Sequence, residues 1–129
     1  MTPAQGLLDT NILIDISRRY APAIQWMQAN TGLVLAIPSL VRMEMVVGAQ
    51  NKLDLDRIIK TLKPFPLVYP SESDAQWAME QFEIYYLRYQ IEIIDCFIAA
   101  TSIRLKLPIY TRNVKDLGIF KDVVLRVPY

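Results

Sequence analysis

Short apolar segments alternate with longer stretches of helical periodicity along this chain, and this alternation constrains the fold more than any other feature. Segments of three to five apolar or β-branched residues, several of them beside Pro or Gly, are typical of buried strands. Strands separated by helices predict an α/β fold in which a parallel sheet is covered by helices on both faces. The strands are expected at residues 6–9, 33–37, 67–69, 108–111 and 123–127.

Two helices are expected between the second and third predicted strands. Ser39, which follows Pro38, is an N-cap candidate for the first of them, and Gly48 lies near its end. The second helix is expected over residues 51–62, because Pro64 prevents it from continuing.

A long helix capped by Ser73 or Asp74 is expected to run to about Tyr89, and another is expected over residues 95–107 with Asp95 as its N-cap. One apolar stripe of the long helix, at spacings of three and four, predicts its core-facing side: Ala75, Met79, Phe82, Tyr86 and Tyr89. A second stripe leaves two interpretations open, burial against a neighbouring helix or exposure to a partner: Trp77, Gln81, Tyr85 and Arg88.

The composition suits one compact domain over residues 1–129, because 53% of its 129 residues are apolar. The net charge of +1 provides no long-range field that would indicate nucleic acid or a membrane surface. A single cysteine, Cys96, excludes an intramolecular disulfide and suits a reducing compartment. The N-terminus lacks a signal-peptide pattern and no apolar run approaches the roughly 18 residues of a membrane span, so we expect a soluble, cytoplasmic protein.

Histidine is absent from the sequence. Its absence excludes Ser-His-Asp triads, Cys-His pairs, ribonucleases with a histidine base and zinc sites with histidine ligands. Any catalysis must therefore depend mainly on carboxylates.

Four acidic residues stand where the apolar pattern alone would not place a charge. Asp9 ends the first predicted strand, and Glu44 interrupts an apolar helix. Asp95 begins a later helix, and Asp116 follows the strand that ends at Thr111. In a parallel sheet covered by helices, ligands bind beyond the carboxyl ends of the strands. Asp9 and the residues after Thr111 are therefore expected to face one crevice.

Clustered carboxylates favour a divalent cation at this crevice. Two unit charges about 4 Å apart repel by roughly 4 kcal/mol at an effective dielectric constant near 20, so the cluster disfavours folding unless a proton or a cation neutralises it. Oxygen ligands without histidine or thiolate select Mg²⁺ or Mn²⁺. Such ions serve phosphoryl chemistry by orienting a water and stabilising charge on oxygen, which makes a phosphodiester the natural substrate.

Each acidic residue also has a purely structural interpretation. Asp9 and Asp95 are equally plausible as helix N-caps, and Asp116 suits a solvated loop. Glu44 needs a partner if it is buried, and Asp15 is expected on a helix surface or behind the metal ligands. Four nearby polar residues either orient ligands and water or serve only in turns and caps: Thr10, Asn11, Thr111 and Asn113.

Three segments in this order resemble those of the PIN-domain ribonucleases and, within them, the VapC-type toxins of toxin-antitoxin pairs: LLDTNILID, VRMEMVVGA and DCFIAATSIRLKLPIYTRNVKDL. The resemblance covers nearly the whole chain. It is carried most strongly by the opening D-T-N and by D-x-x-I-A-A, which T-R-N-x-x-D follows.

The resemblance implies a three-layer α/β/α domain with a central, mainly parallel sheet. It implies Mg²⁺- or Mn²⁺-dependent endoribonuclease activity on structured RNA such as tRNA or rRNA. It also implies a homodimer, and a higher complex with a cognate antitoxin whose C-terminal segment occupies the active-site groove. The family's catalytic and metal-binding quartet corresponds to Asp9, Glu44, Asp95 and Asp116, with Thr111 as a supporting hydroxyl.

Other assignments stay open at this point. A PIN-domain RNA-processing nuclease without a toxin role and a non-catalytic RNA-binding or interaction module are the main alternatives. A phosphoacceptor receiver domain would want adjacent acids after the first strand, where Thr10 and Asn11 follow Asp9 instead. Six basic residues are candidates for RNA phosphate contacts, with solvated surface charge as the alternative for each: Arg18, Arg19, Lys52, Arg88, Arg112 and Lys115.

Overall fold

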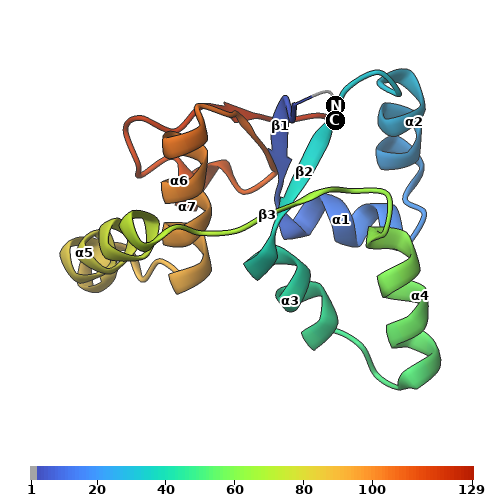
Figure 1. The fold of residues 1–129 in the computed structure, drawn as a ribbon, viewed down its shortest axis with the longest axis horizontal. Coiled ribbons are helices and arrows are strands. Elements are labelled where there is room, and N and C mark those ends of the chain that lie inside the picture. The colour runs from blue at the N-terminus through green and yellow to red at the C-terminus, as the bar shows by residue number, and fades with distance from the viewer. Residues whose placement is uncertain (1–2) are drawn as a thin grey trace.

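The computed structural model describes residues 3–129, and Met1 and Thr2, at the start of the predicted domain, lie outside the described residues. Residues 3–129 form five strands and seven helices (Figure 1). The strands are β1 (Gly6–Leu8), β2 (Leu35–Pro38), β3 (Leu67–Val68), β4 (Ile109–Tyr110) and β5 (Leu125–Arg126). The helices are α1 (Thr10–Ser17), α2 (Ala21–Ala29), α3 (Ser39–Val47), α4 (Lys52–Leu62), α5 (Glu72–Tyr89), α6 (Ile93–Leu105) and α7 (Val114–Leu117).

The strands form one sheet in the order β3-β2-β1-β4-β5, and every neighbouring pair is parallel. β1 lies at the centre, where Leu7 is opposite Ala36 of β2 on one side and Ile109 of β4 on the other. The predicted parallel α/β fold is therefore confirmed, and each of the five predicted strand segments overlaps an observed strand.

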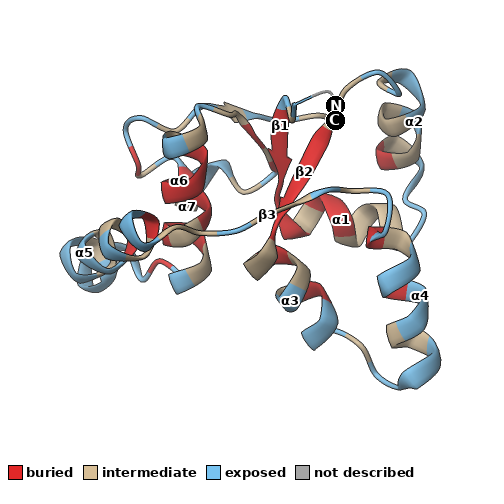
Figure 2. Ribbon diagram, in the orientation of Figure 1, coloured by how far each residue is buried: buried red, intermediate tan, exposed pale blue. Residues whose placement is uncertain are grey.

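Helices cover both faces of the sheet, which confirms the expected three layers. In Figure 1, α1, α2 and α4 lie on one side of the strands, and α5, α6 and α7 lie on the other. Figure 2 shows β1 and β2 buried between these layers, and Leu7 and Leu8 are completely inaccessible. Strands buried on both faces lack polar alternation, which explains their continuous apolar sequences.

A helix that spans a membrane must be both long and strongly apolar, and none of the helices in residues 3–129 meets both conditions.

Two predicted helix caps are wrong. α3 begins at Ser39 itself, because Pro38 occupies the N-cap position and makes no side-chain capping bond. α5 is capped by Ser71 rather than by Ser73 or Asp74. The Ser71 hydroxyl accepts a hydrogen bond from the Asp74 backbone N–H (3.1 Å), and the Asp74 carboxylate accepts one from the Ser71 N–H (3.0 Å). This capping box satisfies two otherwise unpaired donors and so defines the start of the helix.

The predicted core stripe of α5 is correct for Phe82, which packs against the buried cluster, and wrong for Met79, Tyr86 and Tyr89, which are exposed. Met79 and Tyr86 are 55% and 46% exposed, whereas side chains of the second stripe pack inward. The rings of Trp77 and Tyr85 lie 5.6 Å and 6.3 Å from the ring of Phe120, so the burial interpretation is confirmed for these two. Both stripes have helical spacing, and only the position of α5 against its neighbours decides which one is buried.

Asp74 fastens the start of α5 to α6 from a buried position, with 2% of its surface exposed. Its carboxylate accepts hydrogen bonds from the Thr101 hydroxyl (3.2 Å) and from Arg104 Nε (2.9 Å and 3.0 Å to its two oxygens). Arg104 Nη2 also donates to the Tyr69 carbonyl (3.1 Å). A buried carboxylate with this many donors stabilises the packing of the two helices.

Asp74→Ala is expected to lower the free energy of unfolding by about 1–3 kcal/mol, because it leaves buried donors unsatisfied and removes the α5 capping box. Arg104 is about one-third exposed, so water can hydrate its guanidinium when Asp74 is removed. The free energy of unfolding therefore falls by less than it would for a fully buried ion pair. Asp56→Ala removes the exposed pair of α4 with Lys52 and should cost less than about 0.5 kcal/mol. Chemical denaturation measures both, and equal losses would contradict the role assigned to Asp74.

Candidate active site

The carboxyl ends of β1 and β4 meet at the middle of one sheet edge, because Leu8 lies opposite Tyr110. The next residues along each strand are Asp9 and Thr111, which are 4% and 0% exposed. The Thr111 hydroxyl donates a hydrogen bond to Asp9 Oδ2 over 2.8 Å. Two polar residues separated by 102 positions are thereby joined at the edge where ligands bind to parallel sheets.

Asp9 is the N-cap of α1 as well as a member of this cluster. Its Oδ1 accepts a hydrogen bond from the Thr10 N–H (2.8 Å), and its Oδ2 accepts a further one from Asn11 Nδ2 (3.0 Å). Burial raises the pKa of Asp9, the hydrogen bonds from Thr111, Thr10 and Asn11 oppose that rise, and the charge of Glu44 adds to it. The capping interpretation of Asp9 is therefore confirmed, and it coexists with a position in the acidic cluster.

Asn11 fastens the turn after β4 to the start of α1. Its Nδ2 donates to the Thr111 hydroxyl (3.1 Å), and its Oδ1 accepts from the Arg112 backbone N–H (2.9 Å). The Asn113 backbone N–H donates to the same Thr111 hydroxyl (2.8 Å), while the Asn113 side chain makes no capping bond to α7. The polar residues expected beside the site thus hold one another, and Asp9, in a defined orientation.

Asp95 lies in the first turn of α6 and is 6% exposed. Its predicted role as N-cap is wrong, because α6 begins two residues earlier at Ile93 and Glu92 occupies the N-cap position without a capping bond. Burial, followed by the charges of Asp9, Glu92, Asp116 and Glu44, raises the pKa of Asp95 to about 7. Asp95 is therefore the carboxylate on which the negative charge of the site acts most strongly.

Glu44 and Asp116 approach the cluster from α3 and α7. Glu44 is half-buried and accepts a hydrogen bond from the Thr10 hydroxyl, which supplies the partner that a charge among apolar neighbours requires. Asp116 lies on the short helix α7 rather than in a solvated loop, and it is half-buried. The structure therefore brings the other three predicted acids, Asp9, Glu44 and Asp116, within electrostatic reach of Asp95.

The four acids have the donor chemistry of a Mg²⁺ or Mn²⁺ site, because they offer only hard oxygen ligands. Among residues 3–129, no three acidic or thiol side chains are already arranged to hold a metal ion. Asp9 and Glu44 are instead engaged with Thr10, Asn11 and Thr111. Burial, and then repulsion from neighbouring carboxylates, raises the pKa of Asp95; a cation would offset the repulsion, so the donor set fits a divalent ion.

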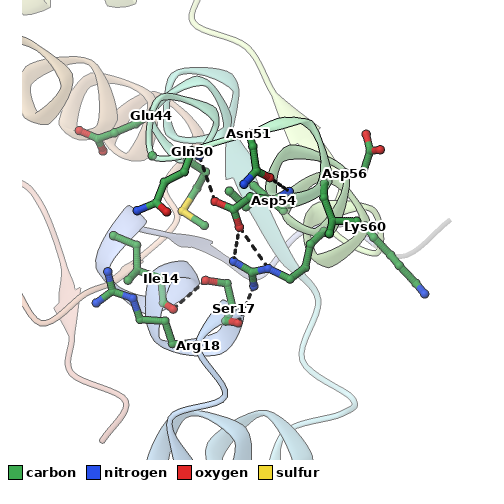
Figure 3. A pocket seen from close by; sticks show the side chains of 14 residues that line it. Ile14, Ser17, Arg18, Glu44, Gln50, Asn51, Asp54, Asp56 and Lys60 are labelled. Carbon is green, nitrogen blue, oxygen red and sulfur yellow. Dashed lines mark hydrogen bonds and ion pairs between the residues drawn. The ribbon is translucent and has the colours of Figure 1, made fainter.

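A groove of about 930 Å³ lies between α1, α3 and α4, and Glu44 is the one member of the acidic cluster in its lining. Figure 3 shows Glu44 at one end of this groove and Asp56 and Lys60 at the other, with Ile14 and Arg18 of α1 along its wall. Apolar side chains such as Met45, Leu53 and Ile58 alternate in its lining with these charged groups. The groove thus joins the acidic cluster to an amphipathic surface.

The predicted RNA contacts lie on several different elements. Arg18 lines the groove that Glu44 also lines, and the Arg112 guanidinium pairs with Asp15 beside the acidic cluster. Lys52 pairs with Asp56 on α4. Three further candidates occupy separate segments: Arg19 after α1, Arg88 on α5 and Lys115 on α7.

Sequence reasoning missed two residues of this region. Glu92 is the second-largest carboxylate contribution to the raised pKa of Asp95, after Asp9, and its position three residues before Asp95 was a detectable signal. Tyr129 donates its hydroxyl proton to Asp15 over 2.6 Å, and nothing in the local sequence indicated a contact across 114 positions.

The chain belongs to the PIN domain family, whose model matches residues 6–121. It is similar to a chain of a toxin-antitoxin complex from Klebsiella pneumoniae, with a TM-score of 0.74, 28% sequence identity, and coverage of 96% of this chain and 98% of that chain. A chain of DNA-bound VapBC from Salmonella typhimurium gives a TM-score of 0.77 at 18% identity, with coverage of 98% and 100%. A chain of VapBC-1 from nontypeable Haemophilus influenzae gives a TM-score of 0.73 at 21% sequence identity, with coverage of 95% of this chain and 96% of that chain. Among curated proteins, none matches this chain significantly.

Asp95→Asn is expected to stabilise the metal-free protein strongly at pH 8 and much less at pH 5. The pKa of Asp95 is about 7 in the folded protein and near 4 in the unfolded chain, so wild-type stability falls as the pH rises between these values. Asparagine remains neutral throughout. Thermal unfolding in EDTA at both pH values measures the difference, with Asp122→Asn as an exposed control. A stability difference independent of pH would contradict the raised pKa.

Proposed function

We propose that this chain is a Mg²⁺- or Mn²⁺-dependent endoribonuclease that acts in the cytoplasm as the toxin of a toxin-antitoxin pair. The observation that carries the proposal is the convergence of four carboxylates on Asp95 at the carboxyl edge of the central strands of a PIN domain: Asp9, Glu44, Asp116 and Glu92. The similarity to a chain of a toxin-antitoxin complex supports the toxin role. Structured RNA such as tRNA or rRNA is the proposed substrate.

In this mechanism Asp9, Glu44 and Asp95 would hold the divalent ion, and Asp116 would help to retain it. The bound ion supplies Lewis-acid chemistry, which lowers the pKa of water and stabilises charge on phosphate oxygens. Thr111 and Asn11 keep the Asp9 carboxylate oriented through hydrogen bonds of 2.8 Å and 3.0 Å. The Thr10 hydroxyl donates a hydrogen bond to Glu44 and holds it at the edge of the cluster.

The protein is expected to cleave tRNA or rRNA with Mg²⁺ or Mn²⁺ and to be inactive in EDTA. Asp9→Asn and Asp95→Asn should each reduce the cleavage rate by on the order of 100-fold, because each removes a charged oxygen ligand. Asp122→Asn, at an exposed aspartate outside the cluster, should retain activity. Gel-resolved cleavage of total RNA measures these rates.

Cleavage that survives both chelation and the two substitutions would falsify the mechanism. RNA binding without cleavage under any of these metal conditions would instead support the non-catalytic module. Growth arrest on expression, relieved by the protein encoded beside this gene, distinguishes a toxin from an RNA-processing nuclease.

The groove between α1, α3 and α4 is the proposed site for a cognate antitoxin. Its apolar lining suits the apolar face of a peptide helix, and Glu44 of the acidic cluster lies at one end of it. An antitoxin Arg or Lys reaching that cluster would offset the repulsion among the carboxylates in place of the metal ion. The exposed residues Leu53 and Asp56 then become contacts of the partner.

We propose that the homodimer forms through a different surface from the one that binds the antitoxin. Apolar side chains remain exposed along α5 and α3, which is unusual for a chain that acts alone. Leu87 is 92% exposed, Ile84 is 63% exposed and Val47 is 83% exposed. A second copy of the chain is the proposed occupant of the α5 part of this surface, in line with the dimer implied by the sequence motifs.

Leu53→Glu is expected to weaken antitoxin binding at least about tenfold, because it places an unpaired charge in the apolar part of the groove. Leu87→Glu makes the same chemical change at an equally exposed leucine of α5 and should weaken self-association while sparing antitoxin binding. Isothermal titration with the co-purified antitoxin measures the first effect, and sedimentation of the free chain measures the second. If the two substitutions have the same effects, the two surfaces are wrongly assigned.

A further inference from the structure

Four residues from three distant segments meet on α1 next to the acidic cluster, and they form what is here named the Arg112 cluster: Asp15, Tyr20, Arg112 and Tyr129. Asp15 Oδ2 accepts hydrogen bonds from the Tyr129 hydroxyl (2.6 Å) and from Arg112 Nη1 (3.2 Å). Arg112 Cζ lies 6.0 Å from the centre of the Tyr20 ring and 5.6 Å from that of Tyr129. The guanidinium is therefore held by an ion pair and by two aromatic rings.

The end of α1 brings Tyr20 into this cluster. Arg19 adopts a left-handed conformation, with φ of 57°, immediately after the helix. Its N–H donates to the Ile16 carbonyl (3.0 Å), and the Tyr20 N–H donates to the Asp15 carbonyl (2.9 Å). This pair of bonds is a Schellman turn, which folds the chain back over the last turn of the helix. Tyr20 consequently lies beside Asp15, and its ring centre is 6.1 Å from that of Tyr129.

The backbone of Arg112 is fastened directly to the acidic cluster. Arg112 follows Thr111, whose hydroxyl donates to Asp9, and its own N–H donates to Asn11, whose amide also donates to Asp9. Asp15 lies one helical turn after Asn11 on the same face of α1. The backbone N–H and the guanidinium of Arg112 are thus both hydrogen-bonded to residues of α1, so the position of its charge relative to Asp9 is defined.

The Arg112 guanidinium retains most of its capacity to bind a ligand. The side chain is 48% exposed, and among residues 3–129 only Asp15 accepts one of its five N–H donors. A guanidinium with free donors matches phosphate oxygens in geometry and charge. An RNA backbone that approaches four carboxylates also needs a cation nearby to reduce the repulsion.

We propose that Arg112 binds a phosphate of the RNA substrate beside the acidic cluster, and that Asp15 and Tyr129 are positioning residues that fix its guanidinium. The proposal rests on the nuclease function proposed above. Burial, and then the hydrogen bond to Asp15, raise the pKa of Tyr129, so its hydroxyl stays protonated and remains a donor. Tyr129→Phe removes that single donor and leaves the ring beside Arg112 in place.

The test is RNA binding by proteins that also carry Asp95→Asn, which keeps the probe intact. Fluorescein-labelled total tRNA is titrated at several salt concentrations. Arg112→Gln should raise the Kd about tenfold and lower the salt-dependence slope by about one, as the loss of one phosphate contact requires. Tyr129→Phe should raise the Kd about threefold, and it should have no further effect when Arg112 is already Gln, because the two residues act as a unit. Lys63→Gln, at an exposed lysine before β3 and therefore near the opposite edge of the sheet, is the matched control.

In the active protein, Arg112→Gln and Tyr129→Phe should raise KM for tRNA and leave kcat within about twofold, whereas a merely structural contact would change the melting temperature and leave KM unaltered. Unchanged Kd and KM in Arg112→Gln, or equal effects of Tyr129→Phe with and without Arg112, would overturn the proposal and leave the nuclease assignment intact. If the Asp95→Asn parent and the wild-type protein neither bind nor cleave RNA, the proposed function fails, and this inference fails with it.

Discussion

A carboxylate buried at the end of the central strand must be supplied with hydrogen-bond donors, and the donors supplied to Asp9 determine how the site is built. They come from the first turn of α1 and from the turn after β4, so the same bonds cap the helix, join two strands at their carboxyl ends and fix the turn that carries Arg112. The parallel pairing of β1 and β4 makes this possible, because it brings two strand ends to the same edge. The fold and the site therefore depend on one set of contacts.

Two buried aspartates of this chain show how the same side chain is used in opposite ways. Asp74 lies among donors from Ser71, Thr101 and Arg104, and its negative charge is matched where it lies. Asp95 is buried to a similar degree and faces other carboxylates instead. The first arrangement stabilises the packing of α5 on α6. The second leaves repulsion between carboxylates, which a bound cation would reduce. The difference lies in the surroundings of each residue and not in its burial.

The sequence predicted the alternation of strands and helices, the parallel sheet and the positions of the four acids, because burial on both faces and strand-end geometry leave signals in short windows. α4 begins within one residue of its predicted start. The errors arose where several residues satisfied one local rule: Ser71 and Ser73 both suit a cap, and both stripes of α5 have helical spacing. The contact of Tyr129 with Asp15 spans 114 positions, so tertiary structure alone reveals it. The candidate metal ligands could be proposed from residue types, whereas the hydrogen bonds that hold Asp9 and Glu44 could not, because they join residues far apart in the chain.

The order of the strands in the sheet determines when the site can form during synthesis on the ribosome. β1 precedes the other strands in the chain and occupies the centre of the sheet, yet its partner β4 and the Thr111 hydroxyl come from about one hundred residues later. Helix α6, which carries Asp95, is also late in the chain. Contacts of such long sequence separation form only after the intervening chain is available. A growing polypeptide therefore carries Asp9 and Glu44 without the rest of the site, and any catalytic capacity arises only after α6 and β4 have been synthesised.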